Sequence, residues 1–204
     1  RNNFRCLFSV TLLKILSFES FMISLTLFLI FVFVALGLGV LAGLSDLRGL
    51  TIPNLYSGLI LGAFPLCYLL MWVFGVQDAI FAPLWSHLGA AGVIFIISAA
   101  MFHFNIMGAA DSKLASAYAL WLGLGALPLY LFIMTLAGAL LGVGALYIKK
   151  NKPFKSPKEG SWPAQLQAGK SKVPYGIAIV AGAAYGFYVA GYLSLTNLAA
   201  AFGI

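Results

Sequence analysis

Long uninterrupted apolar runs dominate the chain. Each clear run is long enough to cross about 30 Å of hydrocarbon as a helix. These runs cover residues 21–44, 55–74, 84–104, 128–148 and 173–192. A shorter run at 114–127, "LASAYALWLGLGAL", is ended by Pro128 and makes a sixth span if it is counted. The pattern therefore predicts an all-α, polytopic integral membrane protein with about six transmembrane helices.

The composition excludes an ordinary soluble domain. Hydrophobic residues make up 62% of the chain and charged residues only 8%, whereas soluble domains carry about a quarter charged residues. The mean hydropathy is +1.02. We divide the chain into a basic N-terminal lead-in at residues 1–20, a six-helix membrane domain at 21–192 and an apolar tail at 193–204. We expect the lead-in to lie at the membrane surface and the tail to be an end or interfacial segment.

The distribution of basic residues predicts the orientation. The loop at 149–172 holds seven of the twelve lysines and arginines, so we expect it on the cytoplasmic side. Its proline, glycine and serine residues predict a flexible segment. By alternation, the loops at 45–54 and 105–113 lie on the same side and the N-terminus on the far side, although basic residues near the N-terminus conflict with that placement. The lysine-rich loop is either a topology determinant that contacts anionic lipid or a docking surface for a partner.

Other sequence features limit the cofactors and partners. Nothing resembles a recognition helix or a basic patch with interleaved aromatics, so we expect no nucleic-acid partner. The two cysteines form no CxxC pair, and His87 and His103 lie at opposite ends of one span without a third ligand. We therefore expect no metal and no cofactor, and structural roles for both histidines. The lipid bilayer is the expected surrounding, and a homo-oligomer is left open.

Glycine pairs at four-residue spacing recur in the apolar runs. This spacing lets helix backbones approach closely where lipid supplies no hydrophobic driving force, so it supports a compact bundle. The pairs are Gly39/Gly43, Gly58/Gly62, Gly138/Gly142 and Gly182/Gly186.

Two of the five acidic residues lie at boundaries between spans and loops on the same predicted face. Asp46 follows the first span in "SDLRGLTIPN", and Asp111 follows the third in "GAADSK". A carboxylate near hydrocarbon is costly and tends to mark a functional site. Two carboxylates held together share a proton and suit activation of water, one as base and the other as acid. The alternative, boundary salt bridges from Asp46 to Arg48 and from Asp111 to Lys113, stays open at this stage.

Three ordered sequence blocks resemble the type IV prepilin peptidase family, the membrane aspartic peptidases with a GxGD signature. The blocks are "SDLRGLTIPN", "MGAADSKL" and "KVPYGIAIVAGA", and the resemblance extends from about residue 30 to 190. The matching positions are Asp46, Arg48, Ile52, Pro53, Asn54, Gly108, Asp111, Lys113, Pro174, Tyr175, Gly176 and Ala178.

The resemblance implies an aspartic endopeptidase of the prokaryotic inner (cytoplasmic) membrane. Its substrate would be a prepilin-like membrane protein of a type IV or Flp pilus, cleaved after a short basic leader at the cytoplasmic face. Asp46 and Asp111 would be the catalytic pair. The supporting or substrate-positioning residues would be Arg48, Pro53, Asn54, Gly108, Ala110, Lys113, Pro174, Tyr175 and Gly176. Arg48 and Lys113 either hold and tune the carboxylates or anchor the chain at the headgroups.

The chain departs from the family pattern in two ways. The glycine expected before the second aspartate is Ala110. Alanine would impair activity if the position requires positive φ, and it would serve if only close approach is needed. The chain also lacks the cytoplasmic four-cysteine zinc segment of longer members, so we expect no methyltransferase activity and a likeness to the short Flp branch. The alternative function is a non-catalytic membrane assembly or transport component that binds pilins or conducts ions.

Overall fold

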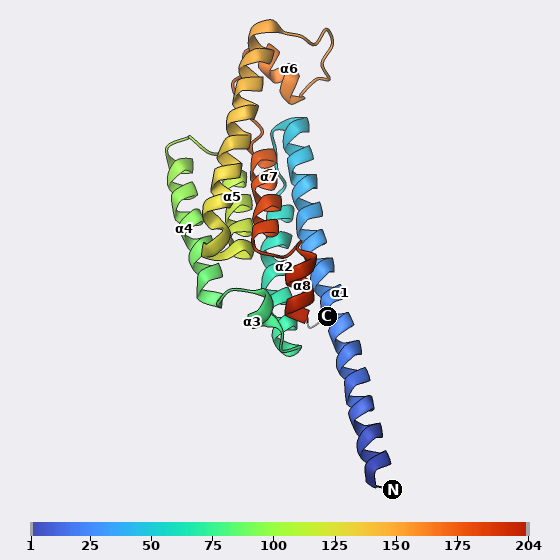
Figure 1. Cartoon of the computed structure of the whole chain (residues 1–204). Coiled ribbons are helices and arrows are strands. Elements are labelled where there is room, and N and C mark those ends of the chain that lie inside the picture. Colours follow the sequence, from blue (N-terminus) through green and yellow to red (C-terminus); the bar gives the residue numbers. More distant parts are fainter. Residues whose placement is uncertain (1, 203–204) are drawn as a thin grey trace.

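The computed structural model describes the backbone of residues 2–202 and the side chains of residues 19–202. The described part of the chain is helical and contains no strand, which confirms the all-α prediction (Figure 1). Its helices are α1 (Asn2–Gly49), α2 (Asn54–Val73), α3 (Gln77–Ile80), α4 (Leu84–His103), α5 (Ala109–Asn151), α6 (Trp162–Gln167), α7 (Tyr175–Val189) and α8 (Leu195–Phe202).

Helices α2, α4 and α7 reproduce the predicted spans to within a few residues, and α1 extends beyond the predicted span 21–44 at both ends. Four of them are long and apolar enough to cross a membrane, namely α1 from Glu19 onward, α2, α4 and α5, and α7 is a shorter apolar helix. Helices α2, α4 and α7 each begin directly after a proline, at Pro53, Pro83 and Pro174. Proline lacks an N–H group and disfavours helical backbone in the residue before it, so it marks the start of a helix.

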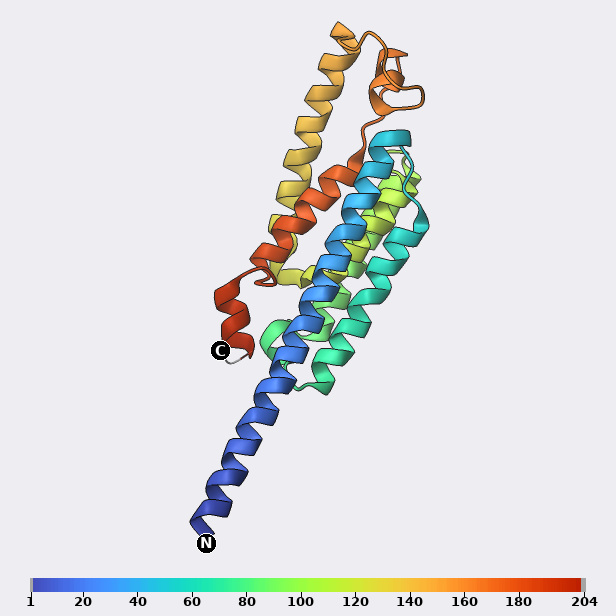
Figure 2. The ribbon, with the colours of Figure 1, turned by 90° about the vertical axis from the view of Figure 1, so that its right-hand side faces the viewer.

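Helix α5 is broken at Gly123, where φ is 66° and ψ is 177°. The break divides α5 into a first limb, residues 109–122, and a second limb, residues 124–151, and the two limbs run in opposite directions (Figure 2). The Tyr130 hydroxyl donates a hydrogen bond to the Ala115 carbonyl at 3.3 Å, which requires the chain to fold back. The described helices thus supply the six expected apolar segments. The predicted break at Pro128 is wrong, because the positive φ that reverses the chain is accessible to glycine, and Pro128 lies within the second limb.

Side chains from neighbouring helices satisfy the backbone groups that the break at Gly123 leaves without helical partners. Such groups need partners inside the protein, since lipid supplies none. The contacts are from His87 Nδ1 to Leu120 O at 2.8 Å, from the Tyr192 hydroxyl to Trp121 O at 2.8 Å, and from Leu124 N–H to Ser86 Oγ at 3.0 Å. His87 therefore holds the break in place, as the structural role expected for it requires.

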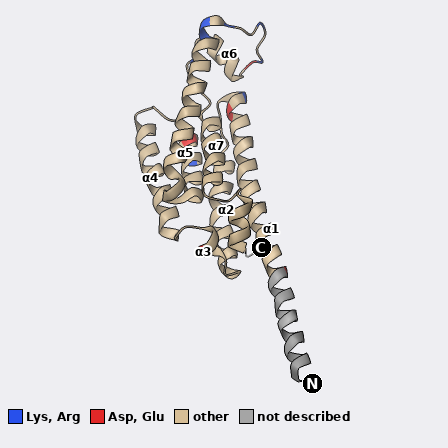
Figure 3. Ribbon diagram, viewed as in Figure 1, with Lys and Arg blue, Asp and Glu red and all other residues tan. Residues whose placement is uncertain are grey.

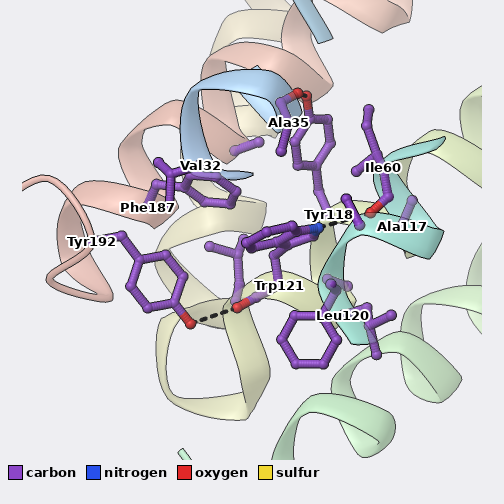
Figure 4. Packing of buried hydrophobic residues seen from close by; sticks show 14 of the residues in the cluster. Val32, Ala35, Ile60, Ala117, Tyr118, Leu120, Trp121, Phe187 and Tyr192 are labelled. Carbon is purple, nitrogen blue, oxygen red and sulfur yellow. Dashed lines mark hydrogen bonds between the residues drawn. The ribbon is translucent and has the colours of Figure 1, made fainter. Parts of the chain in front are cut away.

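The first limb of α5 carries the aromatic centre of the bundle (Figure 4). The indole N–H of Trp121 donates to the Ile60 carbonyl of α2 at 2.9 Å, and the Tyr118 hydroxyl donates to the Ala35 carbonyl of α1 at 2.8 Å. Trp121 also packs against Phe187 of α7, with ring centroids 5.6 Å apart. Each buried polar tip thus has a partner on another helix, and the limb ties α1, α2 and α7 together.

Two of the predicted glycine pairs lie in helix interfaces. A Cβ on Gly182 would lie 2.8 Å from the Tyr130 carbonyl oxygen, and one on Gly39 would meet the Tyr118 hydroxyl. Gly58 and Gly62 do not serve that purpose, because no atom lies within 4 Å of a Cβ on either glycine. The spacing therefore predicted close packing correctly for α1 and α7 and wrongly for α2.

Charged residues gather at one end of the bundle, where α5 ends and α1 ends, and the helical surface between the ends is largely uncharged (Figure 3). The loops after α1 and α4 and the lysine-rich loop lie at this end. The lysine-rich loop is more ordered than expected: it contains α6, whose Trp162 and Leu166 are buried. The Trp162 indole N–H donates to the Lys172 carbonyl at 2.9 Å. The cytoplasmic placement of this end stays a prediction.

The structure describes the predicted apolar tail (193–204) up to residue 202 but only a small part of the side chains of the predicted N-terminal lead-in (1–20). The basic lead-in falls mainly on residues whose side chains lie outside the described part, so its surface location stays a prediction. Within the tail, α8 packs against the bundle through Leu198 and Phe202, which are 7% and 4% exposed. Phe202 meets Phe28 of α1 with ring centroids 6.1 Å apart.

We predict that Gly182→Ala destabilises the protein by about 1–3 kcal/mol, because the new methyl group must displace the backbone of the second limb. The measurement is the thermal unfolding midpoint in detergent. Gly142→Ala is the matched control, since no atom lies within 4 Å of a Cβ there, and its midpoint should be unchanged or slightly raised. Equal effects of the two substitutions would show that the α5–α7 contact is not sterically limited.

Candidate active site

Asp46 lies in the last turn of α1 and reaches the beginning of α7. Its side chain is 5% exposed, and its Oδ2 accepts a hydrogen bond from the Gly176 N–H at 2.8 Å. The first N–H groups of a helix have no partner within the helix, so a carboxylate there is favourable. Asp46 thereby caps α7 from a distant part of the sequence.

The close approach of α1 and α7 at this point requires glycine. A Cβ on Gly176 would lie 3.0 Å from Asp46 Oδ2 and 2.9 Å from Ile52 Cδ1. Any side chain would therefore press on the carboxylate or on Ile52. The first and third sequence blocks thus meet through Asp46, Ile52 and Gly176.

Asp111 is the third residue of α5 and lies beside the Gly108 N-cap. The Asp111 carboxylate lies against Gly108, close to the N–H groups that the start of a helix leaves free. A Cβ on Gly108 would lie 2.7 Å from Asp111 Oδ2, which explains glycine at this position. Behind the carboxylate, Ser112 shares a buried hydrogen bond of 2.6 Å with Ser98 of α4. The start of α5 is therefore fixed to α4.

Asp46 and Asp111 line one cavity of about 560 Å³. The walls come from the end of α1, the end of α4 with its following loop, and the segment before α7. Besides the two aspartates, the cavity is lined by Leu50, Phe102, Asn105, Ile106, Met107, Gly108, Ser171, Lys172, Val173 and Tyr175. The structure thus brings together the two carboxylates that the sequence predicted to be a pair.

The predicted supporting residues divide between this cavity and other surfaces. Gly108 and Tyr175 line the cavity, whereas Arg48 is exposed and lines a separate cavity of about 360 Å³ beside Tyr56. Lys113 Nζ donates to Asn54 Oδ1 at 3.1 Å. Pro53 and Pro174 form the N-caps of α2 and α7.

The alternative salt bridges do not form within the described part of the chain. The polar partner of Asp46 is the Gly176 N–H, the Asp111 carboxylate lies against Gly108, and Lys113 bonds to an amide oxygen. Both carboxylates therefore face the cavity without a cation paired to them.

Ala110 is accommodated without backbone strain. It is the second residue of α5 and has helical backbone. The non-glycine residues with positive φ in the described part are Leu50, Asn105 and Lys152. The GAAD form of the motif is thus compatible with this conformation, and alanine favours helix over glycine by about 0.8–1 kcal/mol.

The sequence analysis missed several residues of the cavity. The most notable is Lys172, the one basic side chain in its lining, which belongs to the lysine-rich loop. The signal was adjacency: Lys172 and Val173 open the third block, Ser171 directly precedes it, and residues 105–107 directly precede Gly108. Within the described residues, no group of three or more His, Cys, Asp and Glu side chains could hold a metal ion.

A comparison with known families decides the identity. The model of the type IV leader peptidase family matches residues 33–143, more than half of the chain, and includes both aspartates. The chain belongs to this family. No curated protein and no solved structure matches the chain.

Membership in the type IV leader peptidase family agrees with the resemblance seen in the sequence and makes the chain a membrane-embedded peptidase. The third block lies outside the matched residues. It joins the matched part through the hydrogen bond from Gly176 to Asp46. The matched residues and the third block therefore both contribute to the aspartate cavity.

We predict that Asp46→Ala destabilises the protein by about 1–3 kcal/mol, because the buried Gly176 N–H loses its acceptor. Asp46→Asn keeps an oxygen acceptor at the same place and should cost less. Thermal unfolding in detergent measures both. Asp78→Ala, at an exposed position in α3, is the surface control and should stay within about 0.5 kcal/mol of the parent. Equal losses from Asn and Ala would mean that the hydrogen bond does not hold α7 against α1.

Proposed function

We propose that this type IV leader peptidase is an aspartic endopeptidase that removes a short basic leader from prepilin-like membrane substrates. The observation that carries the proposal is the shared cavity: Asp46 and Asp111 line the same space at the loop end of the bundle. The positive-inside distribution of lysines supports a cytoplasmic location for that end. No metal or cofactor takes part in the proposed reaction.

The proposed mechanism uses the two carboxyl groups with one proton between them. The ionised carboxylate takes a proton from a water molecule as the water oxygen attacks the scissile carbonyl carbon. The protonated carboxyl gives its proton to the carbonyl oxygen. When the tetrahedral intermediate collapses, the C–N bond breaks and the proton taken from water passes to the leaving amine, while a hydroxyl group of the intermediate returns a proton to the carboxylate that had protonated the carbonyl oxygen. Two nearby carboxyl groups suit both roles because they do not ionise together readily.

The surroundings of the cavity support peptide binding. Phe102, Ile106 and Met107 supply an apolar wall, while Asn105 and Lys172 supply polar groups. Except for Phe102 at the end of α4, these residues belong to the α4–α5 loop and the approach to α7, two loops held by the bundle. Loops positioned in this way commonly carry binding and catalytic residues.

We predict that Asp46→Asn and Asp111→Asn each lower the rate of prepilin cleavage by at least about 10²–10⁴-fold, since each removes one half of the acid–base pair. The assay uses purified protein in detergent with a prepilin-type substrate, and cleavage is followed by mass spectrometry. Asp78→Asn, away from the cavity, should cleave at the parent rate.

Cleavage that persists in either catalytic variant would exclude the aspartate pair. Failure of the parent protein to cleave any prepilin-type substrate would favour the non-catalytic alternative, a membrane assembly or transport component that binds pilins or conducts ions. Thermal unfolding of the two asparagine variants separates loss of catalysis from loss of folding.

We also predict that Ala110→Gly, which restores the literal GxGD motif, changes the cleavage rate by less than about threefold and lowers the free energy of unfolding by at most about 1 kcal/mol. The reason is that Ala110 already has helical backbone at the start of α5. The same cleavage assay and a thermal unfolding scan measure the two effects. A large gain in rate would mean that the active conformation needs a backbone that alanine disfavours.

A further inference from the structure

An apolar groove runs between α2 and α4 on the side of the bundle away from α7. It consists of two cavities, of about 410 Å³ and about 720 Å³, which share Leu61 in their walls. Helices α2 and α4 each pack against α5 but not against each other (Figure 1). The first limb of α5 therefore forms the floor of the groove, and the two other helices form its walls.

The lining residues follow helical spacing on all three elements. The α2 wall consists of Asn54, Ser57, Gly58, Leu61, Phe64, Pro65, Tyr68, Leu69 and Trp72. The α4 wall consists of Leu84, Leu88, Ala91, Gly92 and Phe95, and the floor of Lys113, Ser116 and Leu120. Since α2 has 20 residues, the groove is about 30 Å long, which is the thickness of the hydrocarbon core.

Glycines open the groove to the backbone of another helix. No atom lies within 4 Å of a Cβ on Gly58 of α2 or on Gly92 of α4. In membranes, small residues of this kind mark contacts between helices because they let backbones approach. Gly58, where a Cβ would meet no atom of the chain, thus faces the groove.

A buried hydroxyl without a partner lies at the same place. Ser57 is 5% exposed and lines the groove, and its Oγ makes no hydrogen bond. A polar group left unpaired away from water is costly. Ser57 belongs to the first turn of α2 and marks the loop end of the groove.

The groove and the aspartate cavity both reach the loop end of the bundle. The hydrogen bond from Lys113 to Asn54 closes its loop end. Lys113 lies two residues after Asp111. Asn54 lies two residues after Ile52, which is near the Gly176 position that binds Asp46. A chain segment that leaves the groove at this end would pass the start of α5 to reach the two carboxylates.

From these observations we propose that the groove between α2 and α4 binds the apolar transmembrane helix of the peptidase substrate. The inference rests on the proposed function and specifies where the substrate lies. The bound helix would start near Ser57 and complete a four-helix arrangement with α2, α4 and the first limb of α5. The residues before it, which contain the bond to be cleaved, would then enter the aspartate cavity.

A substitution that fills the groove with a larger side chain tests the proposal. The probe is a synthetic peptide with a short basic leader followed by an apolar helix of about 20 residues. Gly58→Leu should raise KM by about tenfold or more with kcat little changed, because it removes binding of the helix and leaves the chemistry intact. Gly37→Leu is the matched control on α1, where the added atoms also meet open space, and its KM should equal that of the parent. Equal KM values for the two variants would overturn the proposal.

Photo-crosslinking locates the helix directly and does not depend on cleavage. In an Asp111→Asn background, p-benzoylphenylalanine replaces either Phe95, in the groove, or Phe132, on the second limb of α5. The two phenylalanines are similarly exposed, at 55% and 60%. The probe peptide should crosslink at position 95 and not at position 132.

The outcomes of the two assays separate this inference from the proposed function. Crosslinking at position 95 with no cleavage by the parent protein supports the groove and rejects the peptidase mechanism. Cleavage by the parent with crosslinks at position 132, or with lipid alone crosslinked at position 95, supports the mechanism and rejects the groove as the binding site.

Discussion

The reversal of α5 at Gly123 determines where every later element of the chain lies. Because the chain folds back there, the second limb returns to the end of the bundle that carries Asp46 and Asp111. Helix α7 then starts at that end, where Gly176 reaches Asp46. A continuous α5 would carry the lysine-rich loop and the start of α7 to the opposite end. The reversal is tolerated because His87, Tyr192 and Ser86 satisfy the backbone groups that it frees.

The candidate site depends on helix packing as much as on its two acids. Asp46 and Gly176 meet because α7 lies close against α1, and that approach needs the small residues Gly39 and Gly43 facing α7 and the first limb. Asp111 is held differently, by its own helix start and by the serine contact to α4. The two carboxylates therefore stand on separately supported elements, and a movement of α4 with the start of α5 would change their separation.

The sequence predicted the parts of the structure that depend on local chemistry. The spans, their prolines and the pairing of the aspartates on one face follow from hydropathy and alternation. The break at Gly123 could not be separated from Pro128, because both residues end helices and only the tertiary partners show which one does. Contact with the neighbouring aspartates was one of the two roles expected for Arg48 and Lys113, yet residues two apart on a helix point about 200° apart. Both cations accordingly face other surfaces.

The arrangement also gives a physical reason for two separate binding surfaces. Hydrolysis needs water, and the aspartate cavity lies among polar loops at the end of the bundle. Moving an apolar substrate helix from hydrocarbon into water costs free energy. The surface that binds this helix must therefore be apolar and lie within the membrane. The groove between α2 and α4 meets that requirement, and it ends where Lys113 and Asn54 join the starts of α5 and α2. If the proposed function holds, the substrate keeps its apolar helix at membrane depth in the groove while its leader is cleaved in the aspartate cavity.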